Sequence, residues 1–73
     1  MRDKQAIIKD IRSEYGYMLN LREAGELLGF TDKHATWRFL EGLPFCKMGK
    51  EKKFLASDIG NRIYMRMLGT ELR

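Results

Sequence analysis

The most restrictive feature of this sequence is that it offers neither a disulfide nor a structural metal site to stabilise a fold. It contains one cysteine, Cys46, and one histidine, His34, among 73 residues. One cysteine cannot form an intramolecular disulfide, and the pair leaves a structural zinc site short of ligands. A chain of this size rarely gains more than roughly 3–5 kcal/mol from its core. We therefore expect a single domain over residues 1–73 that is held together by packing alone, without a metal.

The composition predicts a globular protein that is not an enzyme. Hydrophobic residues make up 44% of the chain and charged residues 33%, which is too apolar for a disordered chain. No run approaches the ~18 apolar residues of a membrane span, and no signal peptide is recognisable, so we expect a cytoplasmic protein without a membrane partner. There is no nucleophile–histidine–acid set, no glycine-rich phosphate loop and no carboxylate cluster for Mg²⁺. No catalytic residue, cofactor or small-molecule substrate is expected.

The positive charge is concentrated in the second half of the chain. The net charge is +4, and residues 1–43 carry equal numbers of basic and acidic side chains. Within residues 44–69, Glu51 and Asp58 oppose a larger basic set, Lys47, Lys50, Lys52, Lys53, Arg62 and Arg66. Such a local excess predicts a surface that contacts phosphate groups.

Apolar spacing and capping residues predict two helices in the first half. Ile7, Ile8 and Ile11 recur at helical spacing, and Gly16 follows, so we expect a helix over 3–15. Residues 17–19 form a short extended connector. A capping-box pattern at Asn20 and Glu23 then begins a helix that ends at Gly29.

The second half predicts a third helix, a hairpin and a last helix. Thr31 or Asp32 caps a helix that runs to Glu41, with Ala35 and Phe39, and Leu40 beside them, on its buried face. Residues 45–55 read as a two-stranded β-hairpin with a charged tip, and Ser57 or Asp58 begins a helix over 57–68. The expected fold class is therefore α+β, mostly helical, with a helix-turn-helix over 21–41.

Two stretches carry a resemblance to a known family. The run LNLREAGELLGFT over 19–31, and GLPFCKMGK over 42–50 followed by Phe54 to Asp58-Ile59, resemble excisionase-like and MerR-like DNA-binding domains over residues 19–67. The resemblance implies a winged helix-turn-helix with the hairpin as the wing, preceded by an extra N-terminal helix that lies outside the family pattern. Counting forward from Gly29 aligns Ala35 with the buried position of the family, whereas counting back from Gly42 aligns residues 36–38 with the segment that meets DNA.

The predicted contact residues fall into two sets. The recognition helix would present Thr31, Lys33, His34, Thr36, Trp37 and Arg38 to base edges. The wing and its surroundings would contact the backbone through Arg22, Lys47, Lys50, Lys52 and Lys53. Arg38 faces outward under both alignments and carries the most weight.

Some of these residues also have purely structural interpretations. Trp37 can pack against Leu40, His34 can be merely solvated, and Cys46 fits a small buried hydrophobic position in a strand. Lysines on a hairpin can also protect a strand edge from pairing with another chain.

The function that the resemblance implies is architectural. Small members of this family resemble excisionases, the recombination directionality factors of phages and mobile elements, which bind and bend attachment-site DNA and direct an integrase toward excision. The expected partners are double-stranded DNA, a tyrosine or serine integrase, and further copies of the chain on DNA. A small transcriptional regulator of a mobile element is the first alternative. A protein-interaction module whose basic wing binds an acidic partner is the second.

Overall fold

The first helix begins and ends at the residues that its sequence predicts. The computed structural model describes residues 3–69, so the ends of the expected 1–73 domain, residues 1–2 and 70–73, lie outside it. Helix α1 (Lys4–Tyr15) is capped by Asp3, whose side chain accepts a hydrogen bond of 2.8 Å from the Ala6 amide. Gly16 ends the helix at φ 90°, a conformation that favours glycine, and its amide donates to the Arg12 carbonyl.

Strand β1 (Met18–Asn20) leads directly into α2 (Leu21–Leu28). The Asn20 side chain accepts from the Glu23 amide at 2.8 Å, and the Glu23 carboxylate accepts from the Asn20 amide at 3.0 Å. This is the predicted capping box, in which each residue satisfies an amide that the helix leaves unpaired. Because Asn20 is both the last residue of the strand and the cap of the helix, the two elements share a fixed junction.

Helix α3 (Lys33–Leu40) crosses α2 at close range. Asp32 caps it by accepting from the His34 amide at 3.1 Å. At the crossing, a Cβ atom on Gly25 would lie 3.0 Å from Oγ1 of Thr36, so glycine lets the two helices approach. The buried residues of α3 are Thr36 and Leu40, while Ala35 and Phe39 are half-buried and Phe39 packs against the core. The expected buried face is therefore confirmed at Leu40 and in part at Ala35 and Phe39, and it omitted Thr36.

The β-sheet extends beyond the predicted hairpin. Strands β2 (Cys46–Met48) and β3 (Glu51–Leu55) form the predicted hairpin, but β3 also pairs antiparallel with β1, which gives a three-stranded sheet in the order β1-β3-β2. Leu19 lies opposite Phe54, and both side chains are buried. We use "the hairpin" for residues 46–55 throughout.

The last helix, α4 (Ala56–Met67), begins directly after β3. Leu55 is its N-cap and makes no side-chain capping bond, so the predicted start at Ser57 or Asp58 is late. A Cβ atom on Gly60 would lie 2.6 Å from Cγ1 and 3.3 Å from the Cα of Ile8. Helix α1 therefore crosses α4 at a point where only glycine fits without displacement.

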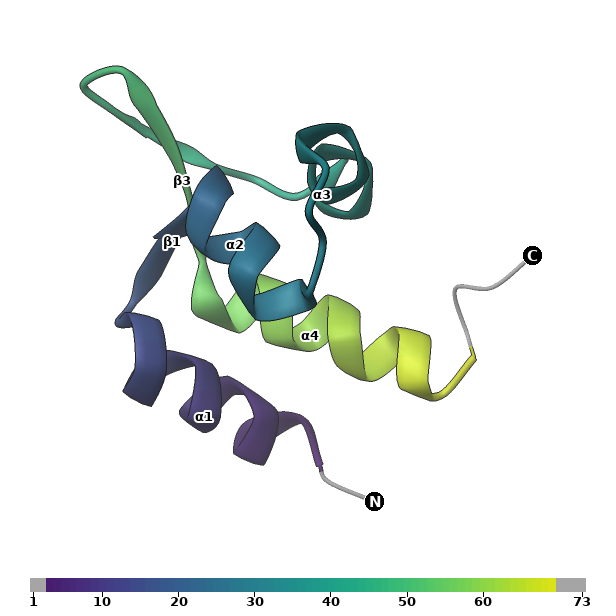
Figure 1. Ribbon diagram of the computed structural model, residues 1–73. Coiled ribbons are helices and arrows are strands. Elements are labelled where there is room, and N and C mark those ends of the chain that lie inside the picture. Colours follow the sequence, from purple (N-terminus) through teal and green to yellow (C-terminus); the bar gives the residue numbers. More distant parts are fainter. Residues whose placement is uncertain (1–2, 70–73) are drawn as a thin grey trace.

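The elements form two layers with a projection (Figure 1). Helices α1 and α4 lie side by side, α2 and α3 lie above them, and the hairpin extends away from α2 and α3. The buried hydrophobic core draws on every layer: Ile7, Ile11, Leu19, Ala24, Leu40, Phe54, Ala56 and Ile59. The isoleucines of α1 thus pack within their own chain. Among residues 3–69, no helix combines the length and apolar character that a membrane crossing requires.

Candidate functional site

A groove of about 780 Å³ runs between the hairpin on one side and α2 and α3 on the other. Seven of the eleven residues that the sequence singles out line it: Arg22, Thr31, Lys33, Thr36, Trp37, Lys50 and Lys52. Further lining residues come from the same three elements and from the turn before α3: Asn20, Leu21, Gly25, Glu26, Phe30, Asp32, Glu51 and Phe54. The groove is therefore the surface on which most of the predicted contact residues converge.

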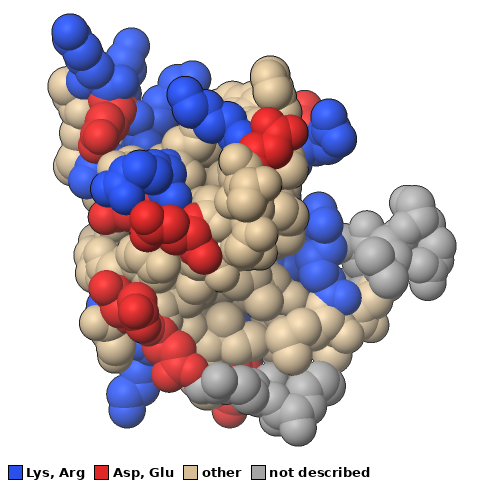
Figure 2. Space-filling view, viewed as in Figure 1, with Lys and Arg blue, Asp and Glu red and all other residues tan. Residues whose placement is uncertain are grey.

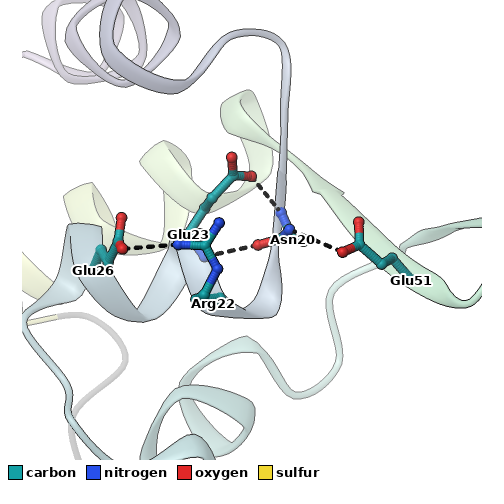
Figure 3. A network of polar contacts seen from close by, with 5 residues as sticks. All are labelled: Asn20, Arg22, Glu23, Glu26 and Glu51. Carbon is teal, nitrogen blue, oxygen red and sulfur yellow. Dashed lines mark hydrogen bonds and ion pairs between the residues drawn. The ribbon is translucent and has the colours of Figure 1, made fainter.

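The acidic side chains of the groove are already engaged. The carboxylate of Glu26 lies 3.0 Å from the guanidinium of Arg22, and the carboxylate of Glu51 accepts a hydrogen bond of 3.3 Å from the side-chain Nδ2 of Asn20 (Figure 3). Asp32 caps α3. Within residues 3–69, Lys33, Lys50 and Lys52 have no acidic partner within ion-pair distance. A hydrogen bond does not neutralise a carboxylate, and the four basic residues of the lining face the three carboxylates of Glu26, Asp32 and Glu51, which leaves a net charge of +1 that favours an anion.

The exposed residues of α3 divide into two faces. Lys33 and Trp37, one turn apart, line the groove, whereas His34 and Arg38, also one turn apart, are exposed but lie outside it. Successive residues of an α-helix are rotated by about 100°, so the second pair points to the side of the first. Arg38 and the hairpin lysines thus do not share the groove, although both faces of α3 are open to solvent.

Thr36 lies on neither exposed face. It is 2% exposed, and its hydroxyl donates to the Asp32 carbonyl at 3.3 Å beneath the α2–α3 crossing. A side chain in that position cannot reach a base edge, so we remove Thr36 from the predicted contact residues. A small polar residue is required there because it packs against Gly25 while satisfying its hydroxyl locally.

The lysines of the hairpin also divide between two faces. Lys47 lies directly opposite Lys52 in the antiparallel register, so both are on the face that is turned toward α3. Lys53 is adjacent to Lys52, so its side chain leaves β3 on the opposite face; it does not line the groove, and its ammonium lies 3.9 Å from Glu51 at the groove's edge. The expectation that all four lysines form one basic surface needs correction for Lys53, because side chains alternate along a strand.

An aromatic cluster holds Lys52 in place at the groove. Its Nζ atom lies 4.8 Å from the ring centroid of Trp37 and 5.0 Å from that of Phe45. Both rings rest on the buried ring of Phe54, at centroid distances of 6.2 Å and 5.8 Å. We call Trp37, Phe45 and Phe54 the aromatic cradle. Each exposed cation–π contact of this kind contributes about 0.5–1 kcal/mol.

The structural interpretation of Trp37 is confirmed in part, and that of Cys46 is wrong. Trp37 is 40% exposed and packs edge-on against Phe54, which joins α3 to the hairpin. Cys46 is exposed at the start of β2, so the prediction of a buried small hydrophobe is wrong. Strand alternation was the signal that could have found this, since it places Phe45 and Phe54 on the inner face and Cys46 on the outer one.

Of the six basic residues within 44–69, Arg62 and Arg66 contact the end of α3 and do not line the groove. The guanidinium of Arg62 donates to the carbonyls of Phe39 and Glu41 at 2.9 Å and 2.6 Å, where α3 ends. Arg66 lies over the ring of Phe39 at 4.8 Å. Both residues therefore satisfy or cover the end of α3.

Charged side chains of both signs cover the face of the molecule drawn in Figure 2. Lys and Arg lie over the hairpin and along the upper edge, and Asp and Glu lie both among them and further down, where Lys and Arg also occur. Burial, with the carboxylates of Glu26, Glu14 and Glu23, raises the pKa of the Tyr15 phenol. Residues 1–43 carry equal numbers of basic and acidic side chains, so the basic excess of residues 44–69 is the net charge that would attract an anionic partner.

Among residues 3–69, no three His, Cys, Asp or Glu side chains lie close enough to hold a metal ion. The comparisons with family models, curated proteins and solved structures find no match to this chain.

Proposed function

We propose that this chain binds double-stranded DNA as a winged helix-turn-helix. Helix α3 enters the major groove with His34 and Arg38 toward the base edges, and α2 braces it from behind. The hairpin is the wing, and Lys47, Lys50 and Lys52 contact the neighbouring phosphates.

One observation carries this proposal: the positively charged groove lies directly beside a helix whose exposed residues are polar or basic. Lys33 at the start of α3 and Lys50 and Lys52 on the hairpin line its two sides without acidic partners among the described residues. A helix that reads DNA needs polar or cationic exposed side chains and flanking cations for the backbone. The close α2–α3 crossing at Gly25 supplies the rigid support that such a helix requires.

We further propose that the consequence of binding is architectural. The resemblance to excisionases supports a protein that bends attachment-site DNA and directs a tyrosine or serine integrase toward excision, with further copies bound alongside. A transcriptional regulator of a mobile element would use the same surface, so an excision assay separates the two. Purified integrase and an attachment-site substrate should yield excised product only when this protein is added.

The DNA-binding step can be tested first. Preferred sequences would be selected from a pool of random duplexes, and affinities measured by fluorescence anisotropy at several salt concentrations. Arg38→Ala should weaken binding to the preferred site by the roughly 5- to 150-fold that corresponds to about 1–3 kcal/mol, and should relax sequence preference. Lys50→Ala should weaken binding to all sequences alike and reduce the slope of log K against log salt by about 1.

Lys9→Ala provides the matched control, because Lys9 is exposed on α1 in the other layer of the fold. It should leave sequence preference unchanged and affinity close to that of the parent. If Arg38→Ala and Lys50→Ala both bind DNA as the parent does, the proposed surface is wrong.

A further inference from the structure

We propose that Trp37 is a positioning residue, whose ring holds the ammonium group of Lys52 where a backbone phosphate of the bound duplex meets the groove. The inference rests on the proposed function and assigns Trp37 a role other than base contact. Trp37 acts on DNA through Lys52, and the aromatic cradle is the device that links α3 to the hairpin.

The geometry gives the Lys52 ammonium a defined position without pairing it with an acidic side chain. Its ammonium lies within 5.0 Å of two ring centroids, one from α3 and one from the segment that enters β2. Ring faces attract the cation but accept no conventional hydrogen bond, and no acidic side chain of residues 3–69 pairs with Lys52. The ammonium donors therefore stay available to phosphate oxygens.

Positioning matters because a lysine side chain is otherwise very mobile. A long flexible cation loses rotamer freedom when it binds, and a cation that is already held in place loses less. The hairpin itself cannot supply this restraint, since it projects away from the rest of the molecule (Figure 1). The restraint comes from Trp37, which is anchored on α3 and packs on Phe54.

Lys47 strengthens the case for an anion at this position. It lies opposite Lys52 on the same face of the hairpin, where two cations repel each other. An anion bound between the two would relieve that repulsion. The cradle thus keeps Lys52 in a position that is unfavourable beside Lys47 alone and favourable when a phosphate is present.

The test is a double-mutant cycle in the full chain. Lys52→Met removes the charge and retains the aliphatic length, whereas Trp37→Leu removes the ring and retains an apolar contact with Phe54. Affinity for a duplex that contains the preferred site would be measured against salt concentration. Trp37→Leu should weaken binding about two- to fivefold, the size expected for one exposed cation–π contact, and should lower the salt slope as Lys52→Met does. In the Lys52→Met background, Trp37→Leu should have little further effect.

Two further measurements separate positioning from simple packing. Trp37→Phe keeps a ring and should restore most of the affinity that Trp37→Leu loses. In the free protein, ring currents should shift the ε-methylene protons of Lys52 upfield, and the shift should decrease in Trp37→Leu, where only the Phe45 ring remains beside Lys52.

The outcomes are distinct. A parent chain that binds no duplex overturns the proposed function and this inference with it. If the parent binds but the Trp37 and Lys52 effects are additive, or Trp37→Leu leaves the salt slope unchanged, the inference alone is overturned. Ordinary chemical shifts for Lys52 in the parent would also overturn it.

Discussion

Where Gly60 of α4 meets Ile8 of α1 there is no room for one additional methyl group, whereas α2, α3 and the hairpin leave a groove of about 780 Å³ between them. The contact at Gly60 is apolar and tightly packed. The groove is open and combines aromatic rings with lysines that lack acidic partners among the described residues. We call these two regions the packed layer and the groove side.

If the groove side binds DNA as proposed, stability and recognition are carried by separate parts of a very small chain. A domain of this size has only a few kcal/mol of stability to lose, so charged and half-exposed groups are tolerable on one side only if the other side packs well. Substitutions in the packed layer should therefore change folding, and substitutions on the groove side should change binding. The predictions below test that separation, from the largest expected effect to the smallest.

Gly60→Val should have the largest effect, a loss of about 2–3 kcal/mol in the free energy of unfolding. The new side chain would meet Cγ1 and the Cα of Ile8, and overpacking against backbone has a cost of this size. Urea denaturation followed by circular dichroism would measure it.

Asn61→Val is the matched control, because Asn61 is the exposed neighbour of Gly60 on the same helix. It introduces the same β-branched side chain without the contact and should cost no more than about 0.5 kcal/mol. Equal stability of the two variants would show that the packed layer is not tight at this point.

Arg62→Met should lower the free energy of unfolding by about 2 kcal/mol and leave the DNA affinity of the folded protein within about twofold. The charged donor to the Phe39 and Glu41 carbonyls is lost, and hydrogen bonds from charged groups contribute about 1.5–3 kcal/mol. Denaturation and anisotropy measurements on the same variant would test both halves. A large loss of DNA affinity with unchanged stability would place Arg62 on the groove side instead.

Asn20→Ala should cost about 1 kcal/mol of stability, because it removes the cap of α2. Asn20→Asp retains a good cap and should therefore recover most of that loss. It loses the 3.3 Å bond to the hairpin, because it places a second carboxylate beside Glu51. Denaturation of both variants separates the two contacts. If Asp is as destabilising as Ala, the bond to Glu51 matters more than the cap.

Lys47→Gln should have the smallest effect on stability, and in the opposite direction. Removing the cation opposite Lys52 relieves repulsion and should raise the free energy of unfolding by a few tenths of a kcal/mol, near the lower end of about 0.2–1 kcal/mol for a cross-strand pair. The same change should weaken duplex binding and reduce its salt dependence. A variant that gains stability without losing affinity would remove Lys47 from the contact surface.

The sequence predicted those parts of the fold that depend on local signals. Asp3, the Asn20–Glu23 capping box and Gly29 define helix ends through bonds to residues at most four positions away. Strand β1 was missed as a member of the sheet because its partner, Lys53–Leu55, is more than thirty positions away in the chain. Nothing local reports such a pairing.

For the candidate site, the sequence predicted which residue types are present more easily than the face to which each side chain points. The sequence identified the lysines of the hairpin, but strand alternation sends Lys53 away from Lys47 and Lys52. It counted Arg62 as surface charge, although this residue caps the end of α3. Thr36 was assigned to the DNA because the helix register was ambiguous, and only the crossing with Gly25 shows that it is buried.

The contact between the first and last described helices bears on how the polypeptide is made. Ile7 and Ile11 are buried in a cluster that includes Ile59, a residue synthesised about fifty codons later. A nascent chain that has not yet extended to α4 lacks the helix against which these isoleucines pack, and only the apolar residues of β1 and α2, such as Leu19 and Ala24, are present to cover them. Folding of this protein should therefore be a late and concerted event, which a stalled-ribosome series would detect as a single step after α4 leaves the exit tunnel.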